Sequence, residues 1–169
     1  MSWDLEFRLP EAGFFNEVQR AQIAALFRAI QPSDRARGIP GADDCGAVDF
    51  LNLLLAFPDS SPVKIHEDLP KWRTSYPVWL NALNAESTAK FATGLADLPP
   101  EQATQLLDSL EKLQIPGVGD DVEQKRAFET IWRHCLQGCW SDPRWGGNRD
   151  RIMWRWLGYL TEAEKVDLM

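Results

Sequence analysis

Apolar residues recur at helical spacing in the first third of the chain. Ile23, Leu26, Phe27 and Ile30 form one stripe, and Asn16 precedes it with Gln19 three residues later, which is the pattern of a capping box. Residues 32–41 are rich in proline, glycine and polar side chains and indicate a turn-rich connection. A second apolar face follows, which ends at Pro58 and consists of Ala47, Val48, Leu51, Leu54 and Leu55.

Three further helical segments are expected after a loop at residues 59–70. Residues 70–95 have a helical composition that Pro77 interrupts, which predicts a kinked helix or two short ones. Leu98, Pro99 and Pro100 open the next helix, whose apolar face comprises Ala103, Leu106, Leu107, Leu110 and Leu113. A long helix that begins near Asp121 is expected to be central, and its apolar positions are Val122, Phe128, Ile131, Trp132, Cys135 and Cys139.

Near the end of the chain, the sequence predicts a loop over residues 141–150 and a short helix over residues 151–159. No run of alternating polarity is long enough to predict a sheet, and no repeat is visible. The chain has 169 residues, about the length of one domain. We therefore predict an all-α fold, a single domain over residues 1–169 that is a bundle of five to seven helices with a Pro/Gly-rich loop before a short C-terminal helix.

Composition excludes several classes of function. Lys and Arg number 18 against 25 Asp and Glu, for a net charge of -7, which is the wrong sign for a general nucleic-acid binder. The longest apolar run, residues 53–57, is far below the roughly 20 residues that span a bilayer. No export signal is visible in the first thirty residues, so we expect a cytoplasmic protein, one whose signal was removed, or one exported with a partner.

Aromatic and positively charged residues are concentrated in residues 132–156. This window holds five of the eight tryptophans and five arginines against two aspartates, on a chain that is negative overall. Trp and Arg are the residues that most often dominate binding energy at protein interfaces. Trp132, on an apolar stripe, is expected in the core. Trp154 and Trp156 are about 200° apart on a helix, so one of them is expected to face outward.

The loop at residues 141–150 has two compatible interpretations. Pro143 should stiffen it, and a left-handed backbone is expected between Gly146 and Asn148. Arg144 and Arg149 are suited to pair with carboxylates of another protein. Alternatively, Asp142 or Asn148 caps a helix, and Arg–Asp pairs close the turn within the chain.

Catalytic and metal-binding patterns are weak. The two histidines, His66 and His134, belong to no local catalytic signature, and both are expected to be solvated or core residues. Residues 117–119 resemble half of a dinucleotide fingerprint, but no strand precedes them. His134, Cys135 and Cys139 lack a fourth ligand for a metal. Cys135 and Cys139 are read as buried thiols, with a disulfide from Cys139 to a partner as the alternative.

Two motifs lie far apart in the sequence: IPGADDCGAVDF at residues 39–50 and LQGCWSDPRWGGNRD at residues 136–150. Both resemble the gluconate 2-dehydrogenase subunit 3 family, the small subunits of sugar and polyol dehydrogenases. GFFN at residues 13–16 and the segment at residues 154–158 also match in order and spacing, so the resemblance covers nearly the whole chain.

The resemblance implies a non-catalytic helical subunit without a cofactor of its own. Its partner would be a large flavoprotein of the glucose-methanol-choline oxidoreductase type, which uses FAD, with a c-type cytochrome as a possible third subunit. A role in folding the partner and in export by a twin-arginine signal would follow, which implies a periplasmic location by co-export or, without the signal, a cytoplasmic one. The residues expected to bind the partner are Trp140, Asp142, Arg144, Trp145, Asn148, Arg149, Arg151 and Trp154, with an intersubunit disulfide at Cys139.

Two alternative functions differ in class. The first is a transient folding or export chaperone that leaves its client. The second is an independent hydrolase that uses carboxylates, either Asp142, Asp150 or the pair Asp43 and Asp44.

Overall fold

The computed structural model describes residues 8–59 and 65–159, and this part of the chain is all-α, as the sequence predicts. It contains seven α-helices and three short 3-10 helices, η1 to η3. Its only strand-like feature is one isolated bridge between Asp34 and Ile39. None of the described helices is both long and apolar enough to cross a membrane. The α-helices are α1 (Glu17–Ile30), α2 (Ala42–Cys45), α3 (Ala47–Ala56), α4 (Leu69–Phe91), α5 (Pro100–Glu111), α6 (Asp121–Trp140) and α7 (Ile152–Trp156).

Helix α1 begins at the predicted capping box. The Asn16 side chain accepts a hydrogen bond from the Gln19 amide at 2.9 Å, and the Gln19 side chain accepts one from the Asn16 amide at 3.2 Å. These two bonds satisfy amide groups that have no partner within the helix. Ile23, Leu26 and Phe27 are buried, so the predicted apolar face is confirmed.

Helix α3 also follows the prediction, and the four-residue α2 before it was not predicted. Gly46 joins the two helices with φ +69°, a left-handed conformation that glycine adopts without steric cost. The helices therefore follow each other with a sharp change of direction.

Helix α4 is one continuous helix through Pro77, so of the two expected forms, a kinked helix or two short ones, the second is wrong. The buried residues Trp72 and Tyr76 before the proline, and Trp79, Leu80 and Leu83 after it, anchor both halves in the core. Burial of these large side chains outweighs the lost backbone hydrogen bond. The helix ends at Phe91, and η1 (Leu95–Asp97) follows where the sequence suggested more α-helix. Within the predicted loop at 59–70, residues 60–64 lie outside the described residues.

Helix α5 buries Ala103, Leu106, Leu107 and Leu110, four of the five predicted positions. Leu113 does not belong to this face. The helix ends at Glu111, and Leu113 lies beyond it with φ +60° and 37% exposure.

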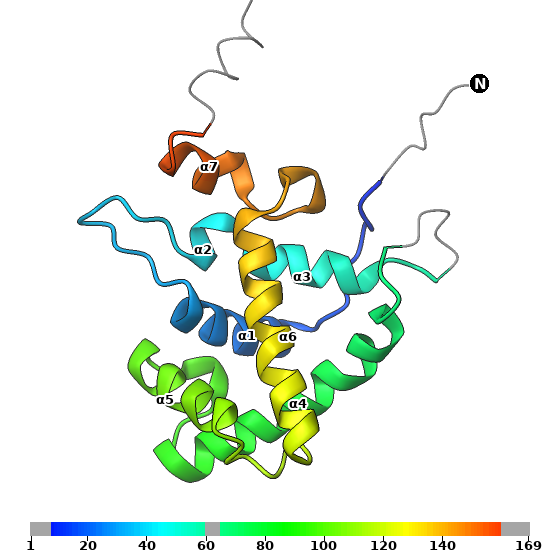
Figure 1. Cartoon of the computed structure of the whole chain (residues 1–169), viewed down its shortest axis with the longest axis vertical. Coiled ribbons are helices and arrows are strands. Elements are labelled where there is room, and N and C mark those ends of the chain that lie inside the picture. Colours follow the sequence, from blue (N-terminus) through cyan, green and yellow to red (C-terminus); the bar gives the residue numbers. More distant parts are fainter. Residues whose placement is uncertain (1–7, 60–64, 160–169) are drawn as a thin grey trace, which may run out of the picture.

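Helix α6 is the central element, as predicted. It packs against α1, α2, α3, α5 and α7. In Figure 1 it runs along the long axis of the molecule, with α2, α3 and α7 near one end and α4 and α5 near the other. The Asp120 side chain caps it by accepting a hydrogen bond from the Glu123 amide at 2.8 Å.

Two residues of α6 that were expected in the core are exposed. Ile131, Cys135 and Cys139 are buried, but Val122 is 66% exposed and Trp132 is 43% exposed. At about 100° per residue, Val122 lies about 180° from Ile131, and Trp132 lies about 100° from it. Val122 therefore points away from the face that the other helices cover, whereas Trp132 lies at the edge of that face, in a groove that residues of α1 and α5 also line.

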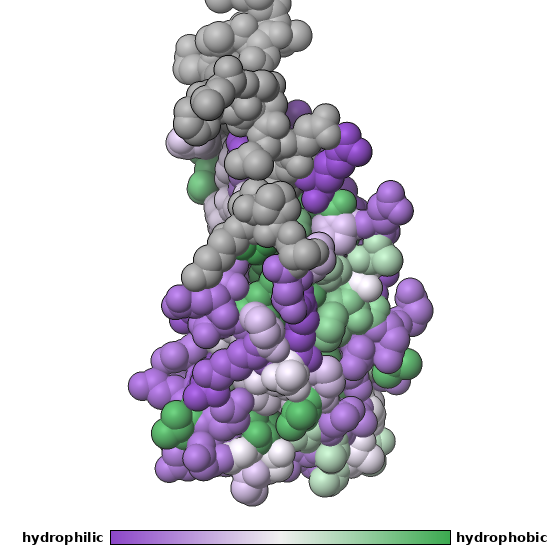
Figure 2. All heavy atoms as spheres, turned by 90° about the vertical axis from the view of Figure 1, so that its right-hand side faces the viewer, coloured by the Kyte–Doolittle hydropathy of each residue, from purple (hydrophilic) through white to green (hydrophobic). Residues whose placement is uncertain are grey.

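The side of the molecule seen in Figure 2 mixes polar and apolar residues. Figure 2 presents the side on the right of Figure 1, and there hydrophilic residues separate the hydrophobic ones into several small patches. Scattered apolar residues of this kind are normal on a folded protein and indicate no binding site by themselves.

Candidate partner-binding surface

The two sequence motifs meet at one end of the molecule. Gly138, in the second motif, packs so closely on Ala47, in the first, that an added Cβ would lie 2.8 Å from the Ala47 Cα atom. Gly147 packs still more closely on the Gly138 carbonyl group. Glycine is required at both positions because a side chain would collide with backbone atoms. Residues about 90 positions apart in the sequence thus form one junction.

The arginine loop, residues 141–151, is held by its own side chains. Asn148 is fully buried, and its side chain donates to the Ser141 carbonyl oxygen at 3.1 Å and accepts from the Met153 amide at 3.0 Å. The backbone amide of Asn148 donates to the Gly138 carbonyl oxygen at 2.7 Å. Asn148 therefore joins the end of α6 to the start of α7 and is not available to a partner.

Asp142 and Arg144 close the first turn of the arginine loop. The Asp142 carboxylate accepts from the Arg144 amide at 3.0 Å and pairs with the Arg144 guanidinium at 2.9 Å. These bonds, together with the charge of Arg151, hold the pKa of Asp142 below its usual range. The intrachain interpretation, in which Asp142 caps and an Arg–Asp pair closes the turn, is confirmed.

The backbone of this loop is left-handed at several positions, as predicted between Gly146 and Asn148. Gly146 has φ +91° and Asn148 has φ +40°, and Asp150 and Arg151 follow at +53° and +58°. Residues other than glycine rarely adopt such φ angles, and each residue that does so costs the fold about 1–3 kcal/mol. The packing described above must therefore hold the loop in this shape.

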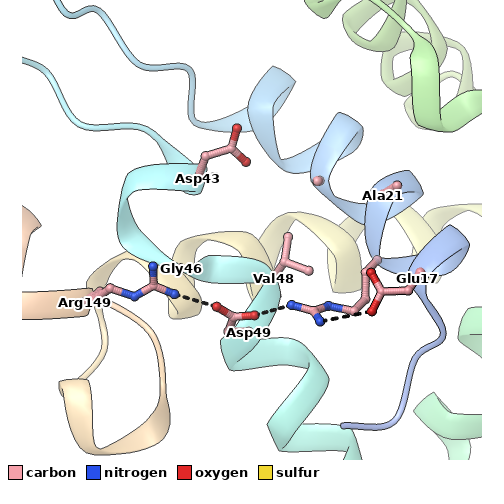
Figure 3. Close-up of a pocket in the computed structure, with 10 residues that line it drawn as sticks. Glu17, Ala21, Asp43, Gly46, Val48, Asp49 and Arg149 are labelled. Carbon is pink, nitrogen blue, oxygen red and sulfur yellow. Dashed lines mark hydrogen bonds and ion pairs between the residues drawn. The ribbon is translucent and has the colours of Figure 1, made fainter.

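Arg149 extends the junction to α1 and α3. Its guanidinium pairs with one oxygen of Asp49 at 2.6 Å, and Arg20 pairs with the other oxygen, also at 2.6 Å. Figure 3 shows the Asp49 carboxylate between the two guanidinium groups, beside Gly46. An added Cβ on Gly46 would lie 3.0 Å from the Arg149 guanidinium, so glycine makes room for it. The three side chains line a cavity of about 370 Å³ whose charges are already paired.

Some of the tryptophans in residues 132–156 pack against the core, and others are exposed. Trp140 and Trp145 pack against the core and are half-buried, and the Trp154 indole donates to the Trp140 carbonyl oxygen at 2.9 Å. Trp156 is 44% exposed, so the expectation that one of Trp154 and Trp156 faces outward is confirmed.

Exposed apolar side chains continue past Trp156. Leu157 is 59% exposed and Tyr159 is 74% exposed. The Trp156 ring lies 6.3 Å from that of Trp140, and the Tyr159 ring lies 6.0 Å from that of Trp154. We call Trp154, Trp156, Leu157 and Tyr159 the aromatic end. It presents apolar area to another molecule, and Trp154 is its one member among the residues expected to bind the partner.

Cys139 is fully buried, as are Cys45 and Cys135, and all three are free thiols. A hydrogen bond with Cys135, together with burial, raises the pKa of Cys139, which suppresses the reactive thiolate form. An intersubunit disulfide at Cys139 does not fit this placement, because its sulfur has no access to a partner chain. The interpretation of Cys135 and Cys139 as buried thiols is confirmed.

Three of the carboxylates named for a hydrolase, Asp43, Asp44 and Asp142, have partners within the chain. Asp43 pairs with Arg28 at 3.4 Å, and Asp44 accepts a hydrogen bond from the Gly41 amide at 2.8 Å. Asp142 is engaged by Arg144, as described above. Within residues 8–59 and 65–159, no group of three or more His, Cys, Asp or Glu side chains is placed to hold a metal.

Sequence reasoning missed four residues of this end of the molecule. Asp49 lies in the first motif, but its link to Arg149 spans 100 positions, and Arg20 joins from a third element. Leu157 and Tyr159 were detectable, because the short C-terminal helix is too small to bury the four large apolar residues at its end.

Comparison with known proteins identifies the family. The family model described as gluconate 2-dehydrogenase subunit 3 matches residues 17–160, which include all seven α-helices and both motifs. Neither the search of the curated proteins nor the search of the solved structures found a match. The chain therefore belongs to the gluconate 2-dehydrogenase subunit 3 family.

Proposed function

We propose that this chain is a non-catalytic accessory subunit that binds and stabilises the FAD-dependent large subunit of a sugar or polyol dehydrogenase. Membership of a family defined by a dehydrogenase subunit supports an accessory role. The proposal includes a large subunit of the glucose-methanol-choline type that holds the FAD, a c-type cytochrome as a further subunit, and assistance in maturation and co-export to the periplasm.

The aromatic end is the observation that carries this proposal. Trp156, Leu157 and Tyr159 expose apolar side chains within four consecutive residues, at the end of the short helix that follows the arginine loop. A protein that works alone gains nothing from leaving such side chains in water, because burying each one contributes about 1.5–3 kcal/mol. Exposed Trp and Tyr are also the residues that dominate binding energy in interfaces.

The arginine loop has a supporting role in this proposal. Arg149 and Arg144 are paired with Asp49 and Asp142 of the same chain, so they fix the loop and the start of α7. A surface fixed before binding loses less conformational entropy when the partner arrives. Both arginines are still more than half exposed, at 55% and 67%, so their outer edges remain available to the rim of an interface.

Co-expression with the large subunit tests the proposal. The double variant Trp156→Ala with Tyr159→Ala removes the two aromatic anchors. We expect recovery of the large subunit in a pull-down to fall at least about tenfold, since one hot-spot residue contributes about 2 kcal/mol or more. The double variant Val18→Ala with Val78→Ala is the matched control, because both valines are more than half exposed but lie on α1 and α4.

Recovery and FAD content are measured together for the wild type and both variants. The control should match the wild type in both quantities. If the aromatic variant also retains full recovery and full FAD content, the aromatic end is not the binding site. If the wild type itself recovers no large subunit, the accessory role is wrong.

A further inference from the structure

A second apolar surface lies between α1, α5 and α6, apart from the arginine loop. It is a groove of about 760 Å³, twice as large as the cavity at Asp49. Its apolar lining comes from Ala29 of α1, Leu107 of α5, and Phe128, Trp132 and Leu136 of α6. We call it the α6 groove.

The α6 side of this groove is an aromatic and aliphatic row. Phe128, Trp132 and Leu136 are spaced four residues apart, so they lie on neighbouring turns of the helix. The Phe128 and Trp132 rings are 5.9 Å apart, and Trp132 is 43% exposed. A half-exposed tryptophan in the wall of a groove leaves a large apolar area without a covering side chain.

The α5 side of the groove is acidic. Asp108 and Glu111 are three residues apart at its edge, and both are exposed. Among the residues that the structure describes, no side chain forms an ion pair with either carboxylate. Across the groove, Glu129 adds a third acid, paired loosely with Lys125 at 4.0 Å, and Arg133 provides the one positive charge of the lining.

This charge distribution decides which occupant fits. A second copy of the chain carries a net charge of -7, and Arg144 and Arg149 of its positively charged segment are already paired with aspartates of the same chain, so it fits an acidic edge poorly. A segment with Lys or Arg along one side would instead pair with Asp108 and Glu111. Grooves between helices commonly receive an amphipathic helix whose apolar face supplies anchors at positions i, i+3 or i+4, and i+7.

We infer that the α6 groove receives an amphipathic helical segment of the large subunit, apolar on the face toward Trp132 and basic on the edge toward α5. This inference rests on the proposed function and adds a second contact between this chain and the large subunit. The row on α6 continues with Trp140, four residues after Leu136, and the Trp140 ring approaches Trp156 in the aromatic end. One partner surface can therefore follow the row from the groove to the aromatic end.

Binding of the purified, FAD-loaded large subunit to the purified full chain tests the inference. Trp132→Ala removes the anchor, and Asp108→Lys with Glu111→Lys reverses the acidic edge. We expect each to raise Kd at least about tenfold, with the charge reversal acting mainly on the association rate and losing its effect at high salt.

The matched control is Glu11→Lys with Glu86→Lys, which changes the net charge equally at two acids outside the groove. It should leave Kd within about twofold of the wild type. Melting temperatures of all variants are compared first, and the charge reversal, being confined to exposed positions, keeps the test valid if Trp132→Ala does not fold.

A photocrosslinking residue placed at Thr104, which lines the groove, identifies the occupant in the intact complex. We expect an adduct with a peptide of the large subunit that contains apolar residues and Lys or Arg. An adduct only with another copy of this chain, or an unchanged Kd for both groove variants, overturns the inference while leaving the proposed function intact. Failure of the wild-type chain to bind the large subunit overturns both.

Discussion

His134 lies fully buried in the core with one of its two ring nitrogens unused. Its Nδ1 atom is 2.8 Å from the Tyr76 hydroxyl, and its Nε2 atom has no hydrogen-bond partner among the described residues. Burial lowers the pKa of His134 to about 3, and the charges of Arg133 and His66 act in the same direction. The imidazole is therefore neutral in the folded protein, which makes it a packing residue.

This pKa predicts a specific dependence of stability on pH. An unfolded histidine titrates near 6.5, so between about pH 6.5 and pH 3 the unfolded chain binds a proton that the folded chain does not. The free energy of unfolding should consequently fall as the pH is lowered through this window, by up to about 1.4 kcal/mol per pH unit from this residue.

Urea unfolding at several pH values from 7 to about 4 measures the effect. The slope that His134 contributes is the difference between the wild type and His134→Gln, and the variant should show the shallower slope. His66→Gln serves as the control, because it removes the other histidine and with it only the smallest of the three causes that lower the pKa of His134. Equal slopes for the wild type and His134→Gln would contradict a buried, neutral His134.

Individual residues show where sequence reasoning succeeds and where it stops. Periodicity fixed the relative directions of Trp154 and Trp156, because two positions on one helix always differ by about 200°. It did not reveal that Trp132 is exposed, because that depends on which face of α6 the other helices cover. The link from Asp49 to Arg149 depends in the same way on the tertiary fold.

At the scale of elements, the contact of α6 with the start of α3 depends on Gly138. An added methyl group there would lie 2.8 to 2.9 Å from three atoms of Ala47, two of them backbone atoms. Because a backbone cannot move aside as a flexible side chain does, we expect Gly138→Ala to lower the free energy of unfolding by about 1–3 kcal/mol.

Thermal unfolding measures this loss, which corresponds to a few degrees in melting temperature for each kcal/mol. Gly117→Ala is the matched control, because its added methyl group would be 3.6 Å from the Ala82 side chain, an ordinary contact. Gly138→Ala with a melting temperature equal to that of Gly117→Ala would show that the two motifs do not pack as described.

The helices that the sequence predicted correctly are those that have both an apolar stripe and clear signals at their ends. Helices α1, α3, α5 and α6 have both, and their bounds follow closely. Helix α2 was missed because four residues are too short for a stripe. For helix α4 the sequence left open one kinked helix or two short ones, because Pro77 is a local signal of interruption; packing of Trp72, Tyr76 and Trp79 on both sides of it keeps one helix.

At the scale of the whole molecule, apolar surface is exposed at the aromatic end and in the α6 groove, which the row on α6 joins. A permanent complex over such a surface would bury upwards of about 2,000 Å². The same surface would also serve a chaperone that binds its client briefly. The two roles differ in the state of the partner that is bound, since a permanent subunit binds the folded partner and a chaperone binds the unfolded one.

This difference has a thermodynamic consequence. A molecule that binds only the folded state stabilises it by RT ln(1 + [L]/Kd), which is about 2.7 kcal/mol at a hundredfold excess over Kd, whereas binding to the unfolded state destabilises the fold. We therefore expect the melting temperature of the FAD-loaded large subunit, followed by release of flavin fluorescence, to rise with the concentration of this chain. Trp156→Ala with Tyr159→Ala should give a smaller rise at every concentration, because the weaker complex is less populated. A melting temperature that stays constant or falls as the chain is added would contradict a permanent subunit and favour the chaperone.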